Sequence, residues 1–323
     1  MLNMLHVIKL YKRLTTLYLK SIYLDYKRLL YCNVNYKLVL LMKLYKLSDG
    51  IILQHNNANY LIQYDWDALI NRDGLYEYLA GTLAGLPIVS EELAKAHIEN
   101  NLLPPIGSQE VWAAGVTYLR SREARMEESA DSGAADLYDK VYAAERPELF
   151  FKSMAHRVAG HKHEVYIRRD SSWNVPEPEM TLFINSKGNI EGYTIGNDMS
   201  SRSIEGENAL YLPQAKIYER SAALGPCLYI PEEAILADTT IKMSISRDNK
   251  EVYRDETSIN RMKRKFDELA GYLYRECDFA NGCFLMTGTC LVPPNDFTLQ
   301  PGDVVSITID GIGNLVNTVS FKP

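Results

Sequence analysis

Short runs of alternating polar and apolar residues, joined by turns rich in Gly, Asn and Asp, fill most of the chain beyond residue 105. The clearest examples are MTLFINSKGNIEGYTIG at 180–196, TTIKMSISRDNKEVYR at 239–254 and DVVSITIDGIGNLVNTVSF at 303–321. A period of two residues indicates half-buried strands, and the Lys-Gly-Asn and Asp-Asn turns indicate antiparallel hairpins. Strands and helices do not alternate as a doubly wound sheet requires. We therefore predict a β-rich α+β fold.

Helical patterns and one Pro-rich stretch suggest how the rest of the chain is divided. The sequence predicts helices at 66–84, 91–101, 120–145 and 260–277. The stretch at 102–107 contains two consecutive prolines and a glycine, which is typical of a linker. We therefore predict a small N-terminal domain at 42–104 and a larger domain at 105–323.

Residues 1–41 differ in composition from the rest of the chain. They hold seven Lys/Arg, a single acid (Asp25) and no Gly or Pro, and they are rich in Leu and Tyr. A mitochondrial presequence is usually richer in Ser and less aromatic, and a basic helix on a membrane surface is a further alternative. We interpret the segment as a non-native or disordered extension, with the folded protein opening at Met42, and we give it no functional role.

Charge and cysteine content exclude several classes of function. The net charge is −6 and the pI about 5.6, which argues against a nucleic-acid surface. No apolar run approaches the roughly 18–20 residues that cross a bilayer. The five cysteines form no CxxC pair, so they indicate reduced thiols in the cytoplasm. A soluble enzyme that acts on a small molecule fits these observations.

Three acidic side chains form a candidate metal site. In Pro176-Glu177-Pro178-Glu179 the prolines favour extended backbone, so both glutamates point to the same face of a strand. The hairpin that follows returns to Asp198 at its far end. Adjacent carboxylates repel one another unless a cation lies between them, and oxygen ligands suit Mg²⁺ or Mn²⁺. A solvated strand face would explain Glu-x-Glu alone, but not the third carboxylate.

Together with GYTIGNDMSSR at 192–202, these carboxylates resemble the metal-ligand motif of the fumarylacetoacetate hydrolase family, in which P-E-x-E and a later N-D bind the metal. The resemblance runs from about residue 115 to the C-terminus. It implies a mixed β-roll catalytic domain of the fumarylacetoacetase C-terminal type and a homodimer or homotetramer. It also implies Mg²⁺ as the cofactor, with Mn²⁺ or Ca²⁺ as alternatives, and a small 2-oxo acid as the substrate.

The resemblance favours one branch of that family. Its carbon–carbon bond hydrolases carry G-x-N-Y-x-x-H, whose histidine activates water, whereas Ser121 stands at that position here. The segments TYLRSREARMEES at 117–129, YAAERPELFFKS at 142–153 and EGENALYLPQAK at 205–216 resemble the sugar-acid dehydratases. That branch converts 2-keto-3-deoxy-D-arabinonate or 2-keto-3-deoxy-D-xylonate to 2-oxoglutarate semialdehyde in pentose degradation.

The resemblance also implies roles for particular residues. The metal would hold the substrate's C1 carboxylate and C2 keto oxygen and stabilise the enolate formed when a C3 proton leaves. Lys216 matches the family lysine beside the metal and is the predicted base, with a pKa lowered by the cation and partial burial. Glu148 or Glu145 would protonate the departing C4 hydroxyl, and their spacing does not choose between them.

Further residues are predicted to contact the substrate. Thr287-Gly288-Thr289 resembles the late T-G-T loop of the family, which binds the carboxylate or oxo group, and the glycine allows close backbone approach. The residues expected at the mouth of the pocket are polar or cationic: Ser121, Arg122 and Lys152.

Two other functions use the same fold. A hydrolase of a 2,4-dioxo acid, such as an acylpyruvate or a diketo-deoxy sugar acid, would keep the metal site unchanged. A catalytically inactive relative that binds 2-oxo acids would keep the ligands without turnover. An oxaloacetate decarboxylase or tautomerase of the family is not separated from these by residues alone.

Overall fold

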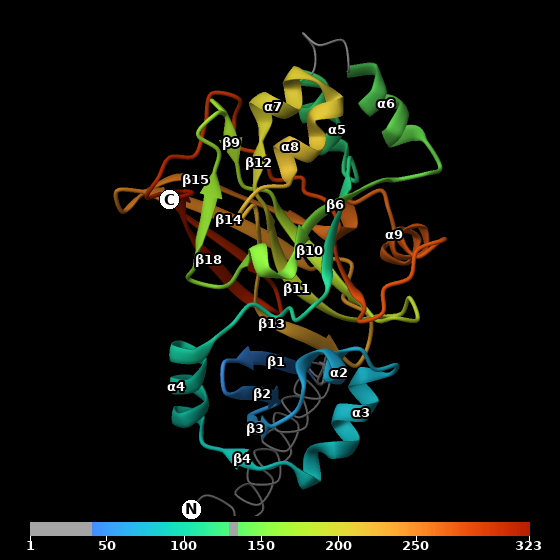
Figure 1. Cartoon of the computed structure of the whole chain (residues 1–323), viewed down its shortest axis with the longest axis vertical. Helices are drawn as coiled ribbons and strands as arrows, with labels where there is room; N and C mark the ends of the chain where they lie inside the picture. The colour runs from blue at the N-terminus through green and yellow to red at the C-terminus, as the bar shows by residue number, and fades with distance from the viewer. Residues whose placement is uncertain (1–40, 129–134) are drawn as a thin grey trace, which may run out of the picture. The chain divides into compact units, whose positions relative to one another are not determined.

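A computed structural model of the chain describes residues 41–128 and 135–323 (Figure 1). From Leu41 to the C-terminus, the described residues pack as one compact unit. The predicted extension, apart from Leu41, lies outside them. The predicted boundary at 104/105 falls in the connection between α4 (Glu91–Asn101) and β5 (Glu110–Gly115), and the division into two domains there stays a prediction.

A large mixed sheet runs through the whole unit, in the order β4-β3-β2-β1-β13-β11-β10-β16-β5-β6, with β7 paired to β13. Most neighbours are antiparallel, but β16–β5 and β13–β7 are parallel. Its other strands are β1 (Leu41–Leu47), β2 (Gly50–His55), β3 (Ala58–Ile62), β4 (Ile88–Val89), β6 (Glu148–Met154), β7 (Val158–Ala159), β10 (Pro178–Ile184), β11 (Ile190–Asp198), β13 (Ala222–Pro231) and β16 (Cys283–Met286).

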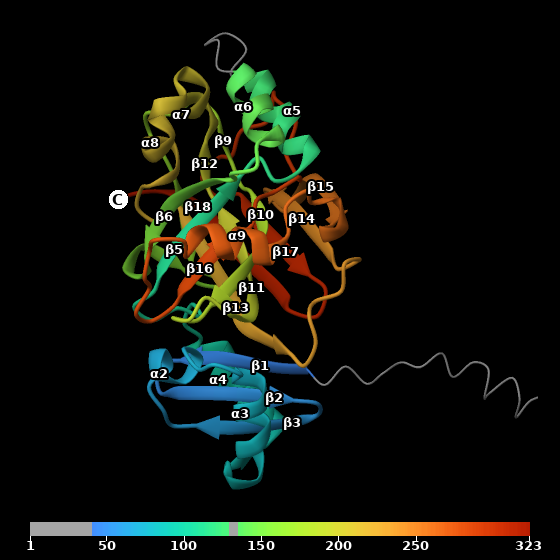
Figure 2. The same cartoon turned by 90° about the vertical axis from the view of Figure 1, so that its right-hand side faces the viewer.

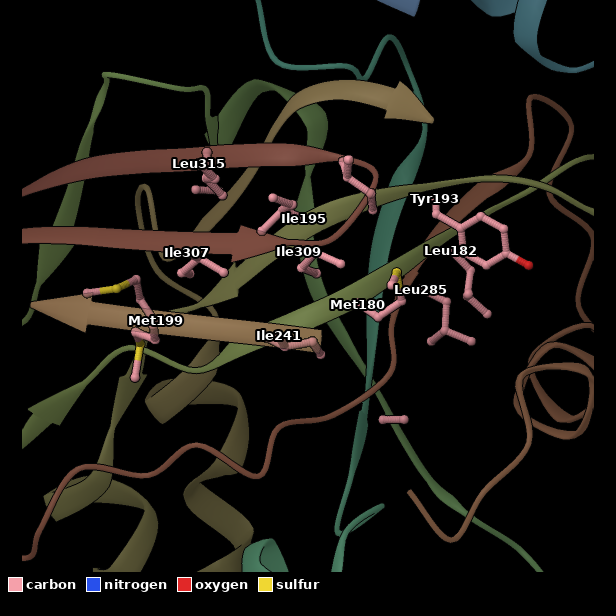
Figure 3. Packing of buried hydrophobic residues seen from close by; sticks show 14 of the residues in the cluster. Met180, Leu182, Tyr193, Ile195, Met199, Ile241, Leu285, Ile307, Ile309 and Leu315 are labelled. Atoms are coloured by element: carbon pink, nitrogen blue, oxygen red, sulfur yellow. The ribbon is translucent and has the colours of Figure 1, made fainter. Parts of the chain in front are cut away.

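A second sheet packs against the middle of the first (Figure 2). Its order is β15-β14-β17-β18-β8, and its strands are β8 (Glu164–Ile167), β14 (Thr240–Arg247), β15 (Lys250–Ser258), β17 (Val304–Ile309) and β18 (Gly313–Phe321). Alternate residues of the two sheets face each other. Met180 and Ile195 of the first meet Ile241 and Ile307 of the second in the main hydrophobic core (Figure 3). The predicted β-rich mixed fold is confirmed.

The predicted hairpins are also confirmed. β10 pairs with β11 across the turn at 185–189, β14 with β15, and β17 with β18. The turn between β14 and β15 is Asp248-Asn249, and both residues have positive φ, as a type I′ turn requires. Period-two alternation therefore located these strands correctly.

The helices are shorter than their sequence patterns. The predicted helix at 66–84 is two, α2 (Trp66–Ile70) and α3 (Leu75–Thr82), because Gly74 adopts φ 67° between them. The pattern at 120–145 covers α5 (Leu119–Glu128) and α6 (Ala135–Ala143), with 129–134 outside the described residues.

The other helices complete the unit. The prediction at 91–101 is confirmed as α4, which Ser90 caps by accepting a hydrogen bond from Leu93 N. The pattern at 260–277 yields only the 3₁₀ turn η4 (Ile259–Arg261) and α9 (Phe266–Leu273).

Helices α5, α6, α7 (Arg202–Glu207) and α8 (Leu212–Lys216) gather at the end of the unit opposite β1–β4, as both views show (Figures 1 and 2). None of the helices in the described ranges combines the length and the apolarity that a bilayer crossing requires. The four cysteines that the structure describes are unpaired.

Candidate metal centre

The hairpin of β10 and β11 brings the three predicted carboxylates together. Glu179 pairs with Gly196, and Asp198 N donates to the carbonyl oxygen of Glu177 at 2.9 Å. One carboxylate oxygen of each acid lies within 4.8 Å of those of the other two, and all three side chains are buried. Their convergence is therefore fixed by strand register, not by flexible side chains.

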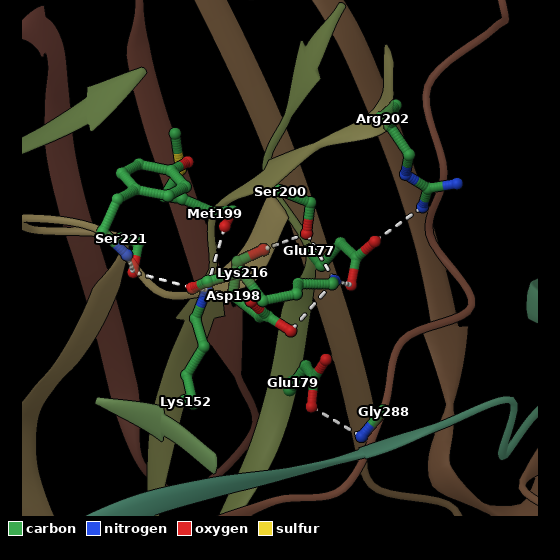
Figure 4. Close-up of polar contacts among 11 residues, drawn as sticks. Lys152, Glu177, Glu179, Asp198, Met199, Ser200, Arg202, Lys216, Ser221 and Gly288 are labelled. Atoms are coloured by element: carbon green, nitrogen blue, oxygen red, sulfur yellow. Dashed lines mark hydrogen bonds and ion pairs between the residues drawn. The ribbon is translucent and has the colours of Figure 1, made fainter. Parts of the chain in front are cut away.

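Three cations contact this carboxylate cluster, Lys152, Arg202 and Lys216 (Figure 4), and the last two contact Glu177. Lys216 Nζ lies 2.8 Å from Glu177 Oε2 and 3.1 Å from Asp198 Oδ2, and it donates to Ser200 Oγ at 2.5 Å. Arg202 Nη2 lies 2.6 Å from Glu177 Oε1. Both side chains are buried, so their charges are paired in a region of low dielectric constant.

Burial and neighbouring charge act differently on two of the acids. Burial raises the pKa of Glu179 well above its ordinary value, and the nearby carboxylates of Asp198 and Glu177 raise it further. Burial also acts to raise the pKa of Asp198, but Lys152 and Lys216 together hold it below its ordinary value. Buried carboxylates of one cluster thus have pKa values moved in opposite directions, and a cation beside Glu179 would favour its ionised form.

A divalent cation fits this set of donors. The three buried carboxylates carry up to three negative charges, and the Lys216 ammonium already lies between two of them. Oxygen-only ligands are those that Mg²⁺, Mn²⁺ and Ca²⁺ prefer. Glu177, Glu179 and Asp198 would hold such an ion.

The loop after β16 closes the cluster on another side. Gly288 has φ 94°, and its N–H donates to Glu179 Oε2 at 2.5 Å. A β-carbon at this position would lie 2.0 Å from Thr117 Oγ1, so only glycine fits. In the loop predicted to bind substrate, the N–H of Gly288 thus already contacts a carboxylate of the cluster, and Thr289 beside it is buried.

A small cavity adjoins the cluster. Wider hollows elsewhere on the described surface, including one along Lys46–Asp67, do not contain the carboxylates. Ser121 lines the cavity, but its hydroxyl accepts from Tyr118 N and donates to Tyr118 O. The lining residues of the cavity, all within the described ranges, include no histidine; they are Ala114, Gly115, Val116, Ser121, Phe150, Glu177, Glu179, Asp198, Arg202, Lys216, Gly288 and Thr289.

The structure places the two candidate acids differently. Glu148 begins β6 opposite Gly115, and a β-carbon at Gly115 would lie 2.0 Å from its Oε2 atom. That oxygen is buried and has no hydrogen-bond partner among the described residues. Glu145 is exposed, and its Oε1 accepts from Tyr272 OH at 3.2 Å. Glu148 therefore lies beside Gly115, which lines the cavity, whereas Glu145 contacts α9.

Two residues predicted at the mouth of the pocket lie elsewhere. Lys152 is fully buried and contacts Asp198 directly instead of lining the cavity, because its ammonium pairs with a carboxylate and not with solvent. Arg122 also does not line the cavity. Its Nη1 atom lies 3.4 Å from Asp139 Oδ1 and its guanidinium stacks on Tyr142, both in α6.

Sequence reasoning missed Arg202 and Ser200 as members of the site. Arg202 contacts Glu177, and Ser200 accepts from Lys216. Both lie within the motif segment at 192–202. An arginine four residues after a predicted metal ligand was an available signal, but only the fold shows that it turns back toward the cluster.

Comparison with known proteins gives consistent results. Residues 111–320 match the family described as Fumarylacetoacetate (FAA) hydrolase C-terminal. The chain is 46% identical over 226 residues to a probable 2-keto-3-deoxyxylonate dehydratase of Haloferax volcanii, covering 70% of this chain and 77% of that protein. It is 41% identical over 222 residues to a 2-dehydro-3-deoxy-D-arabinonate dehydratase of Saccharolobus solfataricus, covering 68% and 74%.

A solved structure is similar over a larger share of the chain. It is a 2-keto-3-deoxy-D-arabinonate dehydratase complexed with magnesium and 2,5-dioxopentanoate. The TM-score is 0.75 at 30% sequence identity, and the match covers 88% of this chain and 99% of that one.

Proposed function

This chain belongs to the fumarylacetoacetate hydrolase family, and on that basis we propose that it is a metal-dependent dehydratase of a 2-keto-3-deoxy pentonate. The product would be 2-oxoglutarate semialdehyde. The two relatives named as pentonate dehydratases and the related structure complexed with magnesium support this proposal. The observation in this chain that carries it is a buried lysine, Lys216, whose Nζ contacts two of three clustered carboxylates.

The cofactor in this proposal is Mg²⁺, held by Glu177, Glu179 and Asp198, with Mn²⁺ or Ca²⁺ as alternatives for the same oxygen donors. The bound ion supplies Lewis-acid polarisation of the substrate's 2-oxo acid group. Arg202 would hold Glu177 in place through its ion pair, and Gly288 N–H would do the same for Glu179.

Two side chains move protons in the proposed reaction. Lys216 in its amine form takes a proton from C3, and the electron pair of that C–H bond forms the C3=C4 double bond. Glu148 donates a proton to the C4 hydroxyl, which leaves as water. Loss of a C5 proton and tautomerisation then give the aldehyde, so the five-carbon skeleton stays intact.

The surroundings of the cavity favour dehydration over hydrolysis. Ser121 occupies the position of the hydrolase histidine, and its hydroxyl is committed to the backbone of Tyr118. Among the described histidines, His161 Nδ1 accepts from Val316 N and His163 Nδ1 from Gly160 N, and neither lines the cavity. An imidazole that could activate water is therefore not among the lining residues.

The family resemblance adds two proposals about the protein as a whole. We expect a homodimer or homotetramer in the cytoplasm, and light scattering on the purified protein would measure the assembly.

The decisive experiment is incubation of the purified protein with Mg²⁺ and a panel of 2-keto-3-deoxy pentonates. A dehydratase forms a five-carbon semialdehyde, which NMR or a coupled semialdehyde oxidation would detect. An acylpyruvate serves as the comparison substrate. Release of pyruvate from it, with no semialdehyde from any pentonate, would identify the chain as a hydrolase instead. Metal binding without turnover on either class would identify an inactive relative.

A further inference from the structure

A buried lysine that the proposed reaction does not use joins two parts of the metal centre. Lys152 is fully buried, and its ammonium forms a 2.5 Å ion pair with Asp198 Oδ1. The same Nζ atom donates to the carbonyl oxygens of Met199 at 2.9 Å and Lys216 at 2.6 Å (Figure 4). One cation thus contacts both a predicted metal ligand and the backbone of the predicted base.

The position of Lys152 on β6 depends on an irregularity of the sheet. Val111 of β5 pairs with Ser153 of β6, but the next residue, Trp112, pairs with Phe151. Lys152 is therefore the extra residue of a β-bulge and has no partner of its own on β5. Bulges redirect side chains and are frequent beside active sites. This one directs a lysine to the end of β11.

The carbonyl oxygen of Lys216 is one that a helix leaves unpaired. Lys216 is the last residue of α8, where carbonyl groups lack partners within the helix. Two side chains supply the missing hydrogen-bond donors here. Lys152 Nζ and Ser221 Oγ both donate to the Lys216 carbonyl oxygen, the hydroxyl of Ser221 at 2.9 Å. The backbone that carries the predicted base is therefore held from two sides.

We propose that Lys152 is a positioning residue that fixes Asp198 relative to the backbone of Lys216. The role assigned to Lys216 rests on the proposed function, whereas the effect on Asp198 does not. Lys152 touches neither substrate nor reacting atoms in this arrangement. It keeps Asp198 and Lys216 in the same relative geometry as the metal ion and the substrate bind and dissociate.

Two effects of Lys152 on metal binding can be told apart by experiment, because removing the residue would change the metal affinity in opposite directions. One effect is the repulsion between its charge and the metal ion, and the other is the orientation of Asp198. Lys152 brings a positive charge close to three carboxylates, so its Coulomb effect alone opposes a second cation. Its removal would then tighten metal binding. If Lys152 instead orients Asp198, its removal takes the cationic partner from a buried carboxylate oxygen and the Lys152 donor from the carbonyl oxygen of Met199, and metal binding weakens. The carbonyl oxygen of Lys216 would keep Ser221 Oγ as its donor.

The test compares the intact protein with its Lys152→Met variant, which keeps the length of the side chain but removes its charge and donors. Mn²⁺ binding to chelator-treated protein is measured by electron paramagnetic resonance, and kcat and KM are measured on 2-keto-3-deoxy-D-arabinonate at saturating Mg²⁺. We expect the Kd for Mn²⁺ to rise about 10-fold or more. We expect kcat to fall about 100-fold, with KM changed less than about 3-fold.

Two further variants make the result specific. Ser221→Ala removes a donor to the Lys216 carbonyl without touching Asp198, so kcat should fall several-fold while Mn²⁺ binding stays unchanged. Lys46→Met is the matched control, because Lys46 also donates to a backbone carbonyl, that of Ile106, but lines a different hollow. It should change neither value.

Unchanged or tighter Mn²⁺ binding in Lys152→Met would overturn the proposal. If that variant does not fold, Lys152→Gln, which removes the charge but keeps an NH2 donor group on a shorter side chain, is measured by the same criteria. Mn²⁺ binding needs no substrate, so it decides the role of Lys152 even if the protein dehydrates no pentonate. Absence of turnover in the unaltered protein would count against the proposed function alone.

Discussion

The metal centre and the helices α5 and α6 are held in place in different ways, although Ser121 of α5 lines the same cavity as the carboxylates. Glu177, Glu179 and Asp198 are buried at one end of the paired strands β10 and β11, and each contacts a cation or a backbone N–H. The side-chain ion pair that links the two helices lies at the surface, although buried Arg264 also donates to the carbonyl oxygens of Val141 and Ala144 at the end of α6. Arg122 and Asp139, which link α5 to α6, are 29% and 57% exposed.

This difference indicates which substitutions the protein should tolerate. A buried ion pair that loses one partner leaves an uncompensated charge, which typically costs about 3–5 kcal/mol. An exposed ion pair contributes about 1 kcal/mol or less. Substitutions in the metal centre should therefore have large and specific effects, and those on the surface of α5–α6 small ones.

The largest expected effect comes from the predicted base. Lys216→Ala should lower kcat about 1000-fold or more, because no other described amine approaches both Glu177 and Asp198 from within the cavity. Calorimetry should show Mg²⁺ affinity largely retained, since the three carboxylates remain. Normal turnover would break the assignment of the proton transfer to this residue.

Substitution of a metal ligand should lower metal affinity, which Lys216→Ala should largely retain. Glu179→Gln should weaken Mg²⁺ binding about 100-fold or more in calorimetric titration, since it removes a charged oxygen donor. Glu191→Gln is the control, because Glu191 also lies on this hairpin but accepts from the N–H groups of Gly74 and Leu75. Equal metal affinity in the two variants would contradict the assignment of the site.

The two candidate acids give a sharper comparison, because they lie three residues apart. Glu148→Gln should lower kcat about 100-fold, the lower end of the range for a general acid. Glu145→Gln should change it less than about 2-fold, since its carboxylate contacts Tyr272 at the surface. Steady-state kinetics on both variants would decide which glutamate is the general acid. A larger loss of kcat in Glu145→Gln than in Glu148→Gln would assign that role to Glu145.

The smallest effect is expected on the surface of α5. Arg122→Gln should raise KM at most about 3-fold and leave kcat unchanged, because its guanidinium contacts α6 and does not line the cavity. A loss of 100-fold would instead show that α5 and α6 close over the substrate and bring this guanidinium into the site.

The parts of the site that follow strand geometry could be predicted from the sequence. Period-two alternation located β10 and β11, and the i, i+2 spacing of Glu177 and Glu179 with a return to Asp198 implied convergence. No comparable rule placed Lys152, because a β-bulge changes the alternation and leaves no mark in the residue pattern.

Helices were harder to delimit for a physical reason. The pattern at 66–84 continued through Gly74, but α2 ends at Ile70, and α3 begins only after Gly74, which has left-handed backbone. Long-range folding brings Arg202 to the cavity and Glu148 to Gly115 beside it, so the local sequence does not indicate where their side chains point. Glu145 and Glu148 looked equivalent in the sequence for the same reason.

The pairing of β1 with β13 has a consequence for any attempt to shorten the protein. Leu41–Leu44 are hydrogen-bonded to Leu228–Pro231, and the next strand on the other side of β13 is β11, which ends at Asp198. A fragment beginning at residue 105 would lack β1, so the backbone donors and acceptors of β13 would form an unpaired edge strand that can pair with another molecule. Loss of solubility would then precede loss of catalysis, although no residue of the reaction had been removed.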